Sequence, residues 1–116
     1  ELLELDVVSY PTYDAGQAVS SSFRMAFRLR PDRKEILIPA HMSPEIRSQA
    51  EAYCAPFGTL VPVADPGGIL DLEDLKAKLS ENTAAVFLEN PSFLGVFQPR
   101  PGRSWTWRTR PEPWAL

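Results

Sequence analysis

Apolar and polar positions alternate in blocks along residues 1–98, and the period changes between helix and strand. In residues 14–30, apolar side chains recur every three or four positions, which predicts an amphipathic helix; they are Ala18, Val19, Phe23, Ala26 and Phe27. The short run "KEILIP" at 34–39 predicts a buried strand that ends at a proline. Similar apolar runs predict strands at 59–64 and 83–90, and residues 6–10 predict an earlier strand.

Helix start and stop signals place two further helices between these strands. In residues 43–58, Ser43 is a candidate N-cap, Pro44 suits the first helical position and Gly58 lies beyond the end. The predicted buried stripe of that helix is Ile46, Ala50, Tyr53 and Cys54. In residues 71–80, Asp71 is the candidate cap, and Asp74 can pair with Lys78 four positions later.

Strands separated by single helices are typical of right-handed βαβ units, so the pattern predicts an α/β fold with a mostly parallel sheet. In such folds, ligands bind outside the carboxyl ends of the strands. This rule selects three segments, "SYPTYDAGQA", "PAHMSPE" and "ENPSFLG". The turn "DPGG" at 65–68 is predicted to lie at the opposite edge and to serve only as a connection.

Composition limits the classes of function. The net charge of -3 and the pI of about 5.1 give no general electrostatic reason to expect nucleic acid or an anionic membrane as partner. A single cysteine and a single histidine exclude a disulfide framework and a Cys/His zinc site, so no metal is expected. No apolar run approaches the roughly 20 residues of a membrane span. We therefore expect a cytoplasmic protein.

The charge is divided unevenly along the chain. Residues 1–98 carry eight Lys and Arg against fourteen Asp and Glu, whereas residues 99–116 carry four Arg, one Glu and all three Trp. This contrast predicts two parts, a partial α/β domain at 1–98 and an atypical basic tail at 99–116 that is disordered or non-native. Stacking on single-stranded nucleic acid and a Pro-rich interaction segment are the alternatives for the tail.

Few side chains are candidates for chemistry. Asp14 and Gly16 open a predicted helix, where free N–H groups could bind an anion, but Asp14 could equally be a simple N-cap. His41 follows a strand end and could act as acid or base, stack on a ligand or be incidental. Asn90 precedes Pro91 at another strand end. It could contact a ligand, or the segment could be a plain turn. Cys54 is interpreted as a buried thiol, and no nucleotide-binding glycine motif is present.

Three strings together resemble one family, "YPTYDAGQA", "AHMSPEIRSQAEAY" and "DLEDLKAKLSENTAAVFLENPSFLG". They are similar to the P protein of the glycine cleavage system, the decarboxylating glycine dehydrogenase, and match its first subunit or the N-terminal half of its fused form. The matching positions are Tyr13–Asp14, His41 with Pro44–Arg47, and Asn90–Gly95. Ile46 replaces the usual aromatic residue of this pattern.

The resemblance implies part of the large domain of a fold-type I pyridoxal-phosphate (PLP) enzyme, with three layers. It also implies that PLP and its Schiff-base lysine belong to a catalytic second subunit, so that this chain binds no PLP by itself. Lys34, Lys76 and Lys78 are accordingly interpreted as surface charges. The implied partners are that subunit and the lipoyl H protein.

The resemblance predicts a non-catalytic part of glycine dehydrogenase, an oxidoreductase of glycine catabolism, that is inactive alone. Residues expected near a shared cofactor site are Tyr13, Asp14, Gly16, His41 and Asn90, and no catalytic residue is expected. The alternatives are a non-catalytic scaffolding or regulatory module and an inactive truncated product.

Overall fold

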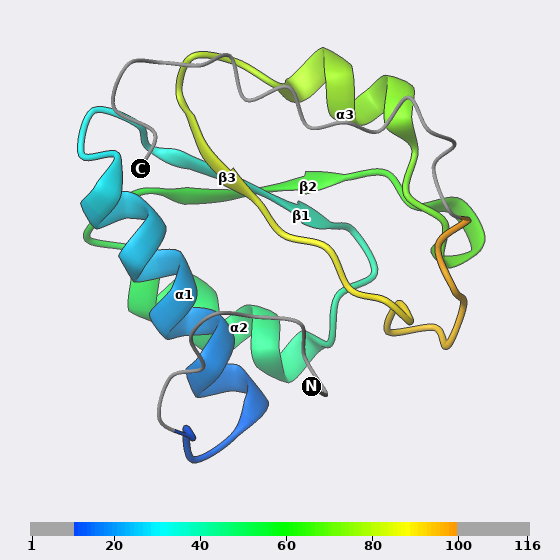
Figure 1. The fold of residues 1–116 in the computed structure, drawn as a ribbon, viewed down its shortest axis with the longest axis horizontal. Helices are drawn as coiled ribbons and strands as arrows, with labels where there is room; N and C mark the ends of the chain where they lie inside the picture. Colours follow the sequence, from blue (N-terminus) through cyan, green and yellow to red (C-terminus); the bar gives the residue numbers. More distant parts are fainter. Residues whose placement is uncertain (1–10, 100–116) are drawn as a thin grey trace, which may run out of the picture.

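The computed structural model describes residues 11–99, which form a three-stranded sheet with helices on both faces (Figure 1). In chain order the elements are α1 (Ala15–Leu29), β1 (Glu35–Pro39), α2 (Pro44–Cys54), β2 (Thr59–Val63), the 3-10 helix η1 (Pro66–Gly68), α3 (Leu72–Lys78) and β3 (Thr83–Val86). The predicted α/β class is confirmed. The strand expected at 6–10 and residues 100–116 of the tail lie outside the described part.

The sheet has the order β2-β1-β3, and both strand pairs are parallel. Figure 1 shows α1 and α2 below the sheet and α3 above it. The two hydrophobic clusters support this arrangement. One joins the sheet to α1 and α2, and the other joins it to Leu75 of α3. The domain therefore has three layers, with β1 as the central strand.

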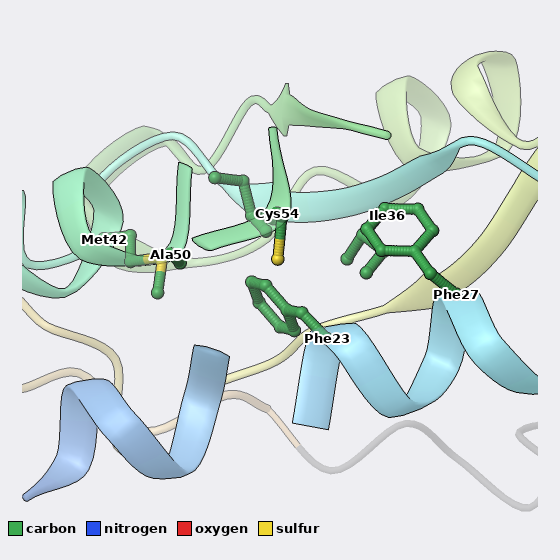
Figure 2. Close-up of a cluster of buried hydrophobic side chains, with 7 residues drawn as sticks. Phe23, Phe27, Ile36, Met42, Ala50 and Cys54 are labelled. Atoms are coloured by element: carbon green, nitrogen blue, oxygen red, sulfur yellow. The ribbon is translucent and has the colours of Figure 1, made fainter. Parts of the chain in front are cut away.

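Strand β1 is buried on both faces because its side chains alternate between the two clusters. Ile36 and Ile38 pack with Phe23 and Phe27 of α1, whereas Leu37 packs on the α3 side. Figure 2 shows Phe23 and Phe27 facing Ile36, with the sulfur of Cys54 directed towards the Phe23 ring. This cluster fixes α1 and α2 on the lower face.

Helix boundaries largely follow the predicted caps. Asp14 accepts a hydrogen bond from the backbone N–H of Gln17, and Asp71 accepts from the N–H groups of residues 73 and 74. The predicted Asp74–Lys78 ion pair is present, with Nζ and Oδ2 2.7 Å apart. Ser43 occupies the predicted N-cap position of α2, but its side chain makes no capping hydrogen bond.

Two further predictions need correction. Tyr53 was expected in the buried stripe of α2 but is 47% exposed, since its ring lies at the rim of the helix pair near the guanidinium of Arg24. Strand β3 was expected to reach residue 90 but ends at Val86. The N–H of Phe87 still donates to the carbonyl of Leu37, but the next donor of β1 would be Pro39, which has no N–H.

Within residues 11–99, no helix has the length and apolar character needed to cross a membrane.

Candidate functional site at the carboxyl edge of the sheet

The carboxyl ends of the three parallel strands meet at one edge of the sheet. At this edge the chain leaves β1 for α2 on the lower face, and it leaves β2 for α3 on the upper face (Figure 1). In α/β proteins, ligands bind outside the carboxyl ends of the strands, and here the connections from β1 and β2 diverge at such a place. The loops after β1 and β2, at residues 40–43 and 64–71, flank this point.

A histidine from the loop after β1 and a buried aspartate from the loop after β2 face each other at this edge. The ring Nδ1 of His41 lies 2.8 Å from Oδ1 of Asp65, and the backbone N–H of His41 also donates to both carboxylate oxygens, at 3.1 and 3.2 Å. The Asp65 side chain is 2% exposed and that of His41 is 56% exposed. The carboxylate is thus enclosed, while the imidazole extends towards solvent.

Strand register explains this pairing. Pro39 of β1 and Val63 of β2 are direct partners in the ladder. His41 lies two residues after Pro39, and Asp65 lies two residues after Val63. The prediction that "DPGG" lies at the opposite edge was therefore wrong, because the turn follows the carboxyl end of a strand parallel to β1. Asp65 could have been identified from its sequence position, because it lies two residues after the end of β2, as His41 does after the end of β1.

Glu89, which follows β3, adds a second carboxyl group to this edge. Burial raises the pKa of Glu89 above its usual value, and the negative charge of Asp65 raises it further. A hydrogen bond from the backbone N–H of Phe93 acts in the opposite direction. The Glu89 carboxyl is therefore more readily protonated than usual, while the carboxylate of Asp65 makes the edge unfavourable for an anionic ligand.

The segment 90–98 folds into a compact loop through its own polar groups. The side-chain oxygen of Asn90 accepts from the N–H of Gln98 at 3.1 Å, so the predicted site residue closes this loop. Inside it, the N–H of Ser92 donates to the carbonyl of Val96 at 2.9 Å, and Gly95 turns the chain with a φ of 77°. The Asn90–Pro91 peptide bond is cis.

Gln98 attaches this loop to η1. Its side-chain NH₂ donates to the carbonyl of Gly68 at 2.8 Å, and its side-chain oxygen accepts from the N–H of Leu70 at 3.0 Å. A Cβ atom added at Gly68 would come within 2.8 Å of the Ser92 hydroxyl, so the close approach of the two segments requires glycine. The loops after β2 and β3 are therefore held together by side-chain amide contacts.

The remaining predicted site residues lie at the start of α1. Asp14 caps this helix, which confirms the capping interpretation, and Tyr13 is 94% exposed. Gly16 is buried against α2, where a Cβ would overlap the side-chain amide of Gln49. Figure 1 shows the start of α1 at the bottom of the view, apart from the loop that follows β3. The structure thus places His41 and Asn90 at the carboxyl edge and gives Tyr13, Asp14 and Gly16 a separate position.

The thiol of Cys54 takes no part in this edge. It is buried between α1 and α2, and this burial raises its pKa, an effect that the charge of Arg24 partly offsets. A thiol that ionises less readily is a poorer nucleophile, so the buried-thiol interpretation is confirmed.

The residues of this chain do not fit a covalently held PLP. A Schiff base needs a lysine amine beside the ligand, but Lys34 precedes β1 and so lies at the amino edge. Lys76 pairs with Glu73, and the Nζ of Lys78 bonds to Asp74 and to the carbonyl of Pro62. Among residues 11–99, no group of three or more His, Cys, Asp or Glu side chains could hold a metal ion.

Comparison with known proteins gives a consistent result at the levels of sequence and structure. The chain is 34% identical over 101 residues to the probable glycine dehydrogenase (decarboxylating) subunit 1 of Staphylothermus marinus, covering 84% of this chain and 22% of that protein. It is 34% identical over 100 residues to the protein of the same description from Carboxydothermus hydrogenoformans, with 85% and 22% covered. No family model matches.

A solved structure, the glycine decarboxylase (P-protein) of the glycine cleavage system in inhibitor-bound form, superposes with a TM-score of 0.65 at 28% identity. The match covers 76% of this chain and 19% of that protein. The chain thus spans about a fifth of the length of the proteins it matches. The resemblance seen in the three motifs is confirmed, and over most of its length the chain is related in sequence and fold to the glycine dehydrogenase (decarboxylating) P proteins, through their subunit 1.

Proposed function

We propose that this chain is a non-catalytic part of glycine dehydrogenase subunit 1 and acts in glycine catabolism together with a PLP-bearing second subunit and the lipoyl H protein. The observation that carries the proposal is the alignment of 84% of the chain with proteins described as subunit 1. The position of Lys34 before β1, the pairing of Lys76 with Glu73, and the bonds of the Lys78 amine to Asp74 and the carbonyl of Pro62 support a non-catalytic role. The PLP of this family would then be held by the partner, and the present fold would supply protein surface beside it.

We further propose that His41 and Asn90 approach the shared site from the carboxyl edge, and that Tyr13, Asp14 and Gly16 contribute through the first turn of α1. The exposure of Tyr13 and of the His41 ring supports contacts with a partner. Asp14 and Gly16 would act indirectly, because the first caps α1 and the second sets its distance from α2.

A binding and exchange assay tests the proposed function. The 116-residue chain is mixed with the purified catalytic subunit, PLP and H protein, and glycine-dependent exchange of labelled CO₂ is measured together with sedimentation. We expect association, no exchange by the chain alone, and weaker association for His41→Ala than for the surface control Lys76→Ala. Failure to associate would exclude the subunit role. Association that leaves exchange unchanged would favour the scaffolding alternative.

A trapping experiment tests the non-catalytic role separately. The chain alone is incubated with PLP, reduced with borohydride and mapped by mass spectrometry. We expect only slow, unselective labelling of Lys34, Lys76 and Lys78. Stoichiometric labelling of one of these lysines, abolished by its replacement with Arg, would contradict the proposal.

A further inference from the structure

The carboxylate of Asp65 has an unusual set of partners among the described residues. It is almost completely buried, and both of its oxygens are directed at one residue, through the backbone N–H and the ring Nδ1 of His41. A buried carboxylate is costly unless its hydrogen bonds are satisfied, so these contacts restrain the ring as well as the backbone. The imidazole is therefore held in one orientation although more than half of its surface is open to solvent.

The contact also determines which ring nitrogen is available. Asp65 is an acceptor when ionised, so Nδ1 must carry the proton that lies between the two side chains. In the neutral ring this leaves a lone pair on Nε2, the nitrogen not engaged by Asp65. A carboxylate that bonds one ring nitrogen in this way fixes the tautomer and the orientation of the ring.

We propose that Asp65 is a positioning residue for His41, and that the pair presents Nε2 of His41 at the carboxyl edge of the sheet as the acceptor for an N–H or O–H group of a ligand. The buried carboxylate of Asp65 favours a neutral or cationic donor over an anion. This inference rests on the proposed function only in placing the ligand at the carboxyl edge of the sheet.

The tautomer of His41 tests the positioning role directly. The chain has one histidine, so a ¹⁵N-labelled sample gives a single pair of ring signals. We expect the neutral ring to be protonated at Nδ1 in the unmodified chain, and the preference to be lost in Asp65→Ala and weakened in Asp65→Asn. The control Asp71→Ala removes a carboxylate that caps α3 and has no contact with His41, so it should leave the tautomer unchanged.

Circular dichroism shows whether each variant folds, and Asp65→Asn keeps the shape of the side chain should Asp65→Ala fail to fold. A ring protonated at Nε2 in the unmodified chain would overturn the proposal. So would a tautomer that is insensitive to both Asp65 variants.

The reactivity of Nε2 provides the second test, with diethyl pyrocarbonate as the probe. This reagent acylates the lone pair of a neutral imidazole, and the modified His41 can be followed by mass spectrometry. We expect the unmodified chain and Asp71→Ala to be acylated at Nε2, and Asp65→Ala to give products at both ring nitrogens, which ¹⁵N NMR distinguishes. Acylation at Nε2 alone in Asp65→Ala, as in the unmodified chain, would overturn the role of Asp65.

Both tests use the chain without its partner, so their outcome does not depend on association. A correct tautomer with no association would remove the proposed function and leave the His41–Asp65 assignment standing. Normal association with the wrong tautomer would remove the His41–Asp65 assignment and leave the proposed function standing.

Discussion

The attachment of the loop 90–98 to η1 rests on one side chain, and its removal gives a quantitative prediction. Gln98→Ala deletes two hydrogen bonds, one from the N–H of Leu70 and one to the carbonyl of Gly68. Each is worth about 0.5–1.5 kcal/mol net, so the local free energy of opening should fall by about 1–3 kcal/mol. Because 1.4 kcal/mol corresponds to tenfold, the amide of Leu70 should exchange with solvent roughly 5- to 150-fold faster.

Native-state hydrogen exchange followed by NMR measures this effect at single amides. Gln98→Glu keeps an oxygen for the N–H of Leu70 but loses the donor to Gly68, so it should show about half the change in free energy. Gln17→Ala, an exposed glutamine on α1, serves as the control and should leave Leu70 unaffected. Unchanged exchange at Leu70 in Gln98→Ala would refute the reasoning. An equal acceleration of amide exchange in the central strand, for example at Leu37, would show that the whole domain and not only this loop is destabilised.

Three further predictions concern stability and are measured by urea unfolding with circular dichroism. Leu37→Ala, at a fully buried position, should lower the free energy of unfolding by about 2–5 kcal/mol. Leu72→Ala, at an exposed position, should lower it far less, and similar losses for both variants would contradict the assigned packing. Asp71→Ala should cost about 1 kcal/mol because two N–H groups of α3 lose their cap, and no loss would argue against capping. The hydrogen bond from the N–H of Ala64, followed by that from Lys78, lowers the pKa of Asp74 below its ordinary value of 3.8. This carboxylate therefore stabilises the fold above that value and loses its contribution as the pH falls through the lowered pKa, so Asp74→Asn should reduce the acid dependence of stability; an unchanged dependence would count against it.

Local patterns predicted the elements of this domain well because the relevant forces act within a few residues. The spacing of apolar positions identified α1, and the β-branched run identified β1. Asp14 and Asp71 were predictable as caps because a cap and its N–H partners are only two or three residues apart. The end of β3 was missed because it depends on Pro39 in a neighbouring strand.

The candidate site was only partly predictable, since its members meet through tertiary structure. His41 and Asn90 could be placed at the carboxyl edge from the strands that precede them. Asp65 could not be paired with His41, because their contact depends on the alignment of β1 with β2. Gly16 was expected at a helix start that could bind an anion, but its contact with Gln49 of α2, which requires a small residue, could not be read from the local sequence.

The alignment of the strands also has a consequence for how the chain selects one structure. Strand β1 reads Ile-Leu-Ile, so a slip by one residue would exchange the two faces and still bury apolar side chains. Such a slip would, however, separate His41 from the enclosed carboxylate of Asp65 and leave that charge without its partner. Apolar burial alone therefore discriminates poorly between the two registers. The His41–Asp65 pair at the end of the strands raises the free energy of the shifted register. It therefore helps to select the observed register of the sheet.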